Sequence, residues 1–140
     1  MKQEERKTIE PQAHLLQSKR RHLDEDERYS YLINVRNPAD SGHFIARAEL
    51  SVDYRSRDGV VVTVKVPAER VAKEEVAYLG DESSLDVPVN LAAREAIEGW
   101  IHFKFAKSLV SDHDVDRFVV LLETGDGGTL SLESIIPMDA

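Results

Sequence analysis

The fold is decided by the segment HFIARAELSVDYR at residues 43–55. Its even-numbered positions, from Phe44 to Tyr54, are all apolar or aromatic, whereas its odd-numbered positions are mostly polar. A side-chain period of two over this length predicts a long β-strand with one face against a core and the other in water. Residues 57–59 (Arg-Asp-Gly) then predict a turn, and the valine-rich residues 60–66 predict a second strand that returns beside the first. We therefore expect a β-sheet protein.

Further strand signals recur along the chain at intervals of roughly 8 to 15 residues. They cover residues 29–36, which end at the turn dipeptide Asn37-Pro38, then residues 94–105, 118–123 and 129–136, the last two forming a hairpin around residues 125–128. This succession of strands with hairpin connections predicts an all-β fold, an antiparallel sandwich of about seven or eight strands.

Two intervening segments are less regular. Residues 85–91 predict a short strand at a sheet edge, because Pro88 cannot donate a hydrogen bond to a neighbouring strand. Residues 68–80 leave two alternatives open, a short helix after Pro67 or an edge strand at residues 76–79.

The beginning of the chain differs from the rest. It is rich in charged residues, and Pro11 suits the first turn of a helix. The apolar face, with Leu16 and Leu23 seven residues apart, is too thin for a self-sufficient helix. We therefore predict a charged, partly helical tail or connector at residues 1–28 and a β-sandwich domain at residues 29–140. A connector of this kind would link the domain to something upstream.

Composition restricts the possible functions. The chain has 140 residues, enough for one domain with an ordinary hydrophobic core, and no cysteine, which excludes disulfides, thiolate metal sites and cysteine nucleophiles. It contains neither an apolar run of the roughly 20 residues that span a membrane nor the apolar core of a signal peptide, so the cytoplasm is the default compartment. Residues 1–28 carry seven basic and seven acidic side chains, so the net charge of −8 resides in the rest of the chain. An acidic body repels phosphate, and nucleic acid is not an expected partner.

The later part of the chain resembles a known type of domain. Residues 87–91 (VPVNL), residues 94–103 (REAIEGWIHF), and residues 119–122 with the turn at residues 126–128 are similar to the second half of immunoglobulin-like accessory domains of bacterial proteins of unknown function. Residues 32–38 are similar to the first strand of those domains. The resemblance implies a sandwich fold, a neighbouring anchor or domain, and no catalytic residues. The disulfide of antibody domains does not carry over, because the chain has no cysteine.

Trp100 and His102 are the candidate contacts for a ligand or partner. They share one face of the strand at residues 94–105 with Glu98 and Lys104, opposite the apolar face. If this face is exposed, Trp100 could stack on a sugar or anchor a partner protein. In the alternative, the leading segment or the second sheet covers this face and Trp100 is buried.

Asp112, Asp114 and Asp116 are the candidate metal ligands, because three carboxylates at alternate positions suit a hard cation. An EF-hand count from Asp112 fails, since its sixth position is Arg117 where that loop requires glycine. A strand is also expected where the motif needs a helix. The alternative is an acidic, solvent-exposed loop between two strands.

No sequence motif for catalysis is found. No serine lies in a Gly-x-Ser-x-Gly elbow, and the five histidines lack the spacings of helical zinc sites. The glycine-rich residues 125–128 lack the lysine, the hydroxyl residue and the helix of a phosphate-binding loop. A cyclic-dinucleotide-binding barrel of the PilZ kind is disfavoured, because Arg20 and Arg21 do not fit its Arg-x3-Arg motif.

We therefore predict a non-catalytic interaction or accessory module that needs no cofactor and binds a protein partner or a second copy of itself. Long strands with an open edge can pair across a two-fold axis, and the leucines within residues 15–23 could pack against a neighbour. The alternative, of a different class, is a domain that binds a carbohydrate or a divalent cation through Trp100 or residues 112–116. An enzyme is not expected.

Overall fold

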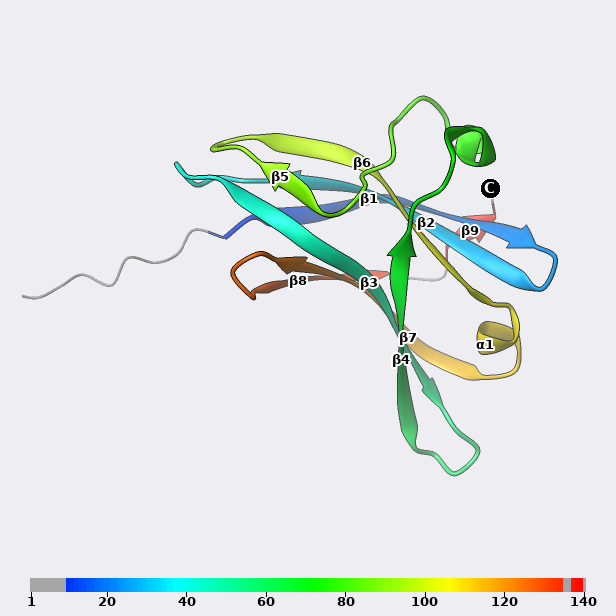
Figure 1. Ribbon diagram of the computed structural model, residues 1–140. Helices are drawn as coiled ribbons and strands as arrows, with labels where there is room; N and C mark the ends of the chain where they lie inside the picture. Colours follow the sequence, from blue (N-terminus) through cyan, green and yellow to red (C-terminus); the bar gives the residue numbers. More distant parts are fainter. Residues whose placement is uncertain (1–9, 135–136, 140) are drawn as a thin grey trace, which may run out of the picture.

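The computed structural model describes residues 10–134 and 137–139, and it is built almost entirely from β-strands (Figure 1). The strands are β1 (Gln12–Leu23), β2 (Asp26–Arg36), β3 (His43–Arg55), β4 (Val61–Glu69), β5 (Val89–Leu91), β6 (Ala96–Ala106), β7 (Asp114–Thr124), β8 (Thr129–Ser134) and β9 (Met138–Asp139). A short 3-10 helix, η1 (Lys73–Leu79), and one helical turn, α1 (Ser108–Ser111), complete the described elements. The prediction of an all-β, antiparallel fold is confirmed.

Strand β4 joins the two halves of the sheet, because it pairs with β3 along its first part and with β6 at its end. The strands lie in the order β8-β7-β3-β4-β6-β2-β1-β9, with β5 beside β3, and the long strands pair in antiparallel fashion. Residues 61–67 of β4 pair with β3, whereas Ala68 and Glu69 pair with β6. At the far ends of this order, β1 and β8 lie side by side. The sheet therefore curls until it is nearly a barrel (Figure 1).

The hydrophobic core fills the inside of this curled sheet. Alternate residues of β2, β3, β6 and β7 point inward, because a strand sends successive side chains to opposite faces. Among the most deeply buried are Tyr31, Ile33, Leu50, Val52, Phe103, Val120 and Leu122. The rings of Tyr31 and Phe103 meet edge to face, with their centroids 5.9 Å apart. Burial of these large side chains supplies the main driving force for the fold.

The strand predicted at residues 43–55 is confirmed, and both of its ends are as predicted. At the start of the strand, however, the side chains that point inward are not the predicted ones. The pairing of β3 with β7 shifts register between Ile45 and Arg47, which is a β-bulge. Ile45 is consequently buried and Phe44 exposed, whereas the alternation predicts the reverse. Beyond the bulge the predicted face holds, and Ala48 lies in the core.

The helix predicted near the beginning of the chain is wrong for the residues that the structure describes. Residues 12–23 form β1, which pairs with β2 along its whole length. The register shifts between Leu15 and Gln17, so Leu15 packs against the core and Leu16 is 47% exposed. This bulge breaks the period of two and leaves two adjacent leucines, which hides the strand from a pattern search.

The less regular segments have short elements. Residues 73–79 form η1, so the edge strand considered at residues 76–79 is wrong. The alternative of a short helix is right, but the helix does not begin directly after Pro67, because that residue still belongs to β4. Of the strand predicted at residues 85–91, only β5 forms. Residues 135–136 of the last predicted strand lie outside the described residues. Within the part of the chain that is described, no helix has the length and apolar character needed to cross a membrane.

Candidate functional site

His102 lies at the centre of a buried hydrogen-bond chain on the outer face of β6. In the sheet it stands opposite Ser30 of β2 and Glu69 of β4. Its Nδ1 is 2.8 Å from the Ser30 hydroxyl oxygen, and its Nε2 is 3.0 Å from the Ser84 hydroxyl oxygen. A neutral imidazole has one donor and one acceptor nitrogen, and a hydroxyl can serve either one. Both ring nitrogens are therefore satisfied without any charge.

Burial keeps this imidazole neutral. Loss of solvent lowers the pKa of His102 to about 4, the nearby Arg28 guanidinium acts in the same direction, and Asp86 opposes them weakly. A general base works best when its pKa lies near the operating pH. The group that hydrogen-bonds Nδ1 is also the hydroxyl of Ser30 and not a carboxylate that would stabilise an imidazolium. This serine–histidine pair is thus poorly suited to activating a nucleophile.

A segment that we call the strap, residues 70–88 between β4 and β5, covers His102 and Trp100. The main-chain N–H of Trp100 donates to the Ser83 carbonyl at 3.0 Å, and the N–H of Leu85 donates to the Trp100 carbonyl at 2.8 Å. Residues 83–85 therefore run beside β6 like a short additional strand. Trp100 is 2% exposed and His102 is 1% exposed. A partner could reach either side chain only if the strap moved away.

The alternative with Trp100 on an exposed sheet face is therefore wrong, and the alternative with a covered face is right. The strap contributes to this cover, since the Ser84 hydroxyl contacts His102 on that face. Gly99 signals a close approach of the strap on the opposite, inner face of β6, since a glycine inside a strand marks the approach of another backbone. A Cβ atom at Gly99 would lie 2.8 Å from both the Leu85 Cβ and the Ser83 carbonyl oxygen.

Arg28 fixes the first half of the strap to the sheet. Its guanidinium is buried, and Nε donates to a Glu69 carboxylate oxygen at 3.2 Å while Nη2 donates to Glu75 of η1 at 3.3 Å. The guanidinium of Arg21 also lies over the Tyr78 ring, 4.3 Å from its centroid. Charge-assisted contacts of this kind are geometrically specific, so η1 has a defined position over β1 and β2.

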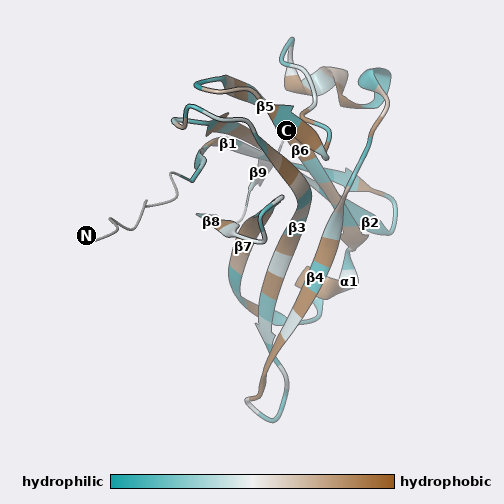
Figure 2. Ribbon diagram, turned by 60° about the vertical axis from the view of Figure 1, so that its left-hand side comes forward, coloured by the Kyte–Doolittle hydropathy of each residue, from teal (hydrophilic) through white to brown (hydrophobic). Residues whose placement is uncertain are grey.

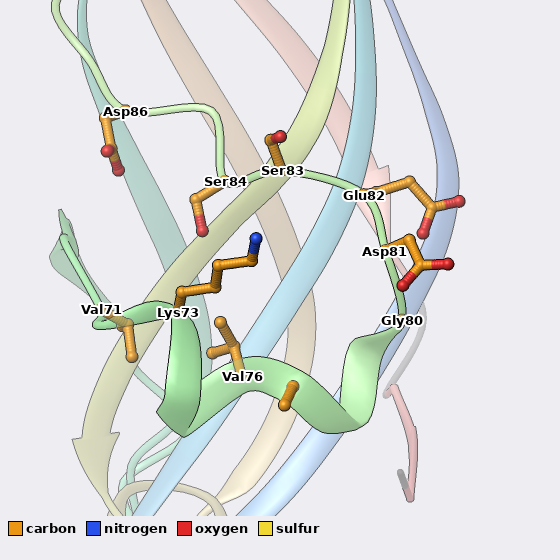
Figure 3. A pocket seen from close by; sticks show the side chains of 10 residues that line it. Val71, Lys73, Val76, Gly80, Asp81, Glu82, Ser83, Ser84 and Asp86 are labelled. Carbon is orange, nitrogen blue, oxygen red and sulfur yellow. The ribbon is translucent and has the colours of Figure 1, made fainter.

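A cavity of about 560 Å³ lies between η1 and the second half of the strap (Figure 3). Its walls include the apolar side chains of Val71 and Val76, the ammonium group of Lys73 and the Ser84 hydroxyl, and three carboxylates stand around it, those of Asp81, Glu82 and Asp86. Figure 3 shows the Lys73 side chain extending from η1 toward the serines of the opposite limb. The lining is part polar and part apolar, and its charged side chains sum to a net negative charge.

The three candidate metal ligands do not form a common site. Asp112 directly follows α1, Asp114 begins β7, and Asp116 accepts a hydrogen bond from Arg55 Nε at 2.9 Å. All three side chains are exposed. No group of three or more histidines or acidic residues that could hold a metal ion occurs in the described residues.

The first part of β4 is an open sheet edge. Residues 61–67 pair with β3 on one side, and within the described ranges no strand pairs with residues 61–66 on the other. Val60 and Val61 are each more than half exposed, although valine is usually buried. Figure 2 shows the β3–β4 hairpin projecting from the body of the molecule, with hydrophobic residues along β4. An unpaired strand with exposed valines is a surface that another strand can join.

Comparison with known proteins leaves the family open. The chain matches no protein-family model and no curated protein sequence. Among solved structures, a protein from Archaeoglobus fulgidus is 12% identical, with 89% of this chain and 92% of that chain covered and a TM-score of 0.49. A structural genomics target, SoR45, is 10% identical, with 90% of this chain and 80% of that chain covered and a TM-score of 0.34. At these similarities neither structure carries an argument about this chain.

Proposed function

We propose that this chain is a non-catalytic interaction module and that its contact surface is the open edge of β4. The observation that carries the proposal is the unpaired edge of residues 61–66 beside the exposed Val60 and Val61. Partner proteins commonly add a strand to such an edge: main-chain hydrogen bonds give the affinity, and alternate side chains give the specificity. Lys65 and Pro67 oppose pairing at the far end of this edge, so the contact centres on residues 60–64.

We further propose that the module is an immunoglobulin-like sandwich. In domains of that type, strands A, B, E and D form one sheet and strands C, F and G form the other. Strands β1, β2, β6 and β4 follow one another as A, B, E and D would, and β3, β7 and β8 follow one another as C, F and G would. The extra pairing of β4 with β3 closes the two sheets together along one side. This strand order supports the proposal, and fold analogy adds no argument about the partner.

Site-specific photocrosslinking in the native host tests the contact surface. A photoreactive phenylalanine analogue at Val61 should yield a discrete crosslinked product, because this position faces the partner. The same analogue at Leu16, which is 47% exposed on β1, is the matched control and should yield none. A product of twice the chain mass of 15.8 kDa identifies a second copy, and another discrete mass identifies a different protein. No product from Val61, or equal products from both positions, contradicts the proposal.

A second proposal, of a different class, is carbohydrate binding in the cavity between η1 and the second half of the strap. Its supporting observation is that Ser84, Lys73 and three carboxylates line one cavity together with Val71 and Val76, since carboxylates and hydroxyls are suited to hydrogen bonding with sugar hydroxyls. A glycan array with the wild-type chain and with Asp86→Asn checks it. Binding that is lost in Asp86→Asn supports the cavity, whereas no binding, or binding that the variant retains, removes it.

A further inference from the structure

The free hydrogen-bonding groups along the open edge of β4 belong to alternate residues. The Ser56 N–H donates to the Val60 carbonyl at 2.9 Å, which makes these two residues a hydrogen-bonded pair at the end of the β3–β4 hairpin. The pairing of β3 with β4 continues in the same register, and hydrogen-bonded pairs alternate with non-hydrogen-bonded pairs along an antiparallel ladder. The even-numbered residues of β4 therefore bond to β3. The main-chain N–H and C=O groups of Val61, Thr63 and Lys65 point away from β3, toward the open edge.

The side chains of this edge form two rows, one on each face of the sheet. Val62 and Val64 are half-buried on the inner face, where Val64 packs against the core. The side chains of Val61, Thr63 and Lys65 are exposed on the outer face. Lys65 is the only charged residue of the edge. A partner strand must therefore place β-branched or other apolar side chains along most of the edge and a group other than a cation opposite Lys65.

A second copy of the same edge meets these requirements in one register. A two-fold axis that relates two antiparallel edge strands is perpendicular to the sheet, so it passes between two residues of the same number. With the axis at Thr63, Val61 lies opposite Lys65 of the second copy, and every outward N–H and C=O of the three residues has a partner. Moving the axis toward Lys65 brings two like charges together, which is destabilising. Moving it toward Val61 sets Lys65 against residues 57–59, which form a turn and not a strand.

We infer that two copies of this chain join through their β4 edges about a two-fold axis at Thr63, so that the sheet continues from one copy into the other. On the inner face Val62 lies opposite Val64 of the second copy, and cross-strand pairs of β-branched residues stabilise a sheet. On the outer face Val61 contacts the aliphatic stem of the second copy's Lys65, whose ammonium group stays in water. The β3–β4 hairpin projects from the body of the molecule, which gives a second hairpin access to the edge (Figure 2). This inference rests on the proposed function, because it names the partner of the same edge.

Single-cysteine variants of the full chain test the position of the axis. The chain has no native cysteine, so an introduced cysteine can pair only with its counterpart in a second copy. Under mild oxidation Thr63→Cys should form a disulfide-linked dimer, because hydrogen-bonded residues opposite each other on antiparallel strands have Cα atoms about 5.5 Å apart. Val61→Cys, exposed on the same edge and the same face, is the matched control. Its counterpart lies roughly 14 Å away in the proposed dimer, so it should crosslink at least about tenfold more slowly.

Charge substitutions at Val61 test the same pairing by sedimentation equilibrium, at concentrations up to the millimolar range. Val61→Glu places a carboxylate opposite Lys65 of the second copy and should tighten the dimer about fivefold, whereas Val61→Lys places a like charge there and should weaken it by a similar factor. The position is more than half exposed in the single chain, so both variants should fold. The same two substitutions at Leu16, which is 47% exposed on β1, are the matched controls and should leave the dimer unchanged.

Three results overturn the inference: a wild-type chain that stays monomeric throughout this range, equal crosslinking of the two cysteine variants, or the same response to both charges at Val61. Failure of the inference is distinguishable from failure of the proposed function. A monomeric chain whose Val61 position crosslinks in the host to a product of another mass rules out the second copy alone. The absence of any crosslinked product from Val61 contradicts the contact surface itself.

Discussion

His102 shows how a single residue can hold a long segment in place. It joins a serine of β2 on one side to a serine of the strap on the other, and it is buried between them. Protonation of the imidazole is disfavoured because it would place a buried positive charge near the Arg28 guanidinium. The attachment of the strap should therefore weaken in acid.

This attachment gives a pH prediction with a defined sign. The pKa of His102 in the folded protein is about 4, below the value of about 6.5 for an unfolded histidine, so the unfolded chain binds more protons between these two pH values. The stability contributed by neutral His102 is complete above about pH 6.5 and is lost as the pH falls toward 4. From pH 7 to 4.5, we expect the wild type to lose about 2 kcal/mol more free energy of unfolding than His102→Gln does.

Urea unfolding at the two pH values measures this difference. Glutamine at position 102 keeps one hydrogen-bond donor and one acceptor but does not titrate, so it is the appropriate reference. The acidic side chains titrate in both proteins and cancel in the comparison. Equal losses in the two proteins would show that His102 does not control the acid response.

At the scale of the element, β1 depends on a single bulge. Before the shift at Leu16, Ala13 and Leu15 pack against the core; after it, the inward positions include Arg20 and His22. One extra residue thus changes which side chains the strand turns inward. Arg20 and His22 therefore line a pocket beside Lys107 and Val110.

Two adjacent leucines give a direct test of the strand. We expect Leu15→Ala to reduce the free energy of unfolding by about 2 kcal/mol, because it removes methyl groups packed against the core. Leu16→Ala, at a half-exposed position, should change it by less than about 0.5 kcal/mol. Urea denaturation of the two variants measures both values. Similar effects at the two positions would contradict the register of β1.

The alternation in the sequence was sufficient to place the ends of the long strands. The strand at residues 43–55 has its predicted ends, and β6 differs from its prediction by one or two residues. Bulges at Leu16 and beside Ile45 defeated the same pattern, because one inserted residue reverses the predicted face. Such insertions are set by pairing with a neighbouring strand, which a single-strand pattern does not contain.

Only part of the candidate site could be predicted from the sequence. The alternation in β6 brought Trp100 and His102 to attention, but Ser30 is 72 residues from His102 and Ser84 is 18 residues from it. No local pattern links such positions, since the strap is placed by tertiary contacts.

At the scale of the whole molecule, the change of partner along β4 determines where the sheet is closed and where it is open. The end of β4 at Ala68 and Glu69 bonds to β6 and completes the curl, whereas residues 61–66 diverge from β6 and leave their outer edge unpaired. By contrast, residues 118–122 of β7 have β3 on one side and β8 on the other. The two strands are a natural pair for comparison.

Amide hydrogen exchange followed by NMR should reveal this difference. At a concentration where light scattering shows a monomer, alternate amides of residues 61–66 point away from β3 and should exchange at least about a hundredfold faster than the amides of residues 118–122. The intervening amides of β4 point toward β3 and should be slower than their neighbours, so the alternation itself identifies an open edge. If a partner strand pairs with β4, adding that partner should protect the fast set and leave β7 unchanged. Uniformly slow exchange across residues 61–66 in the monomer would mean that the edge is already covered, and the proposed contact surface would have to be abandoned.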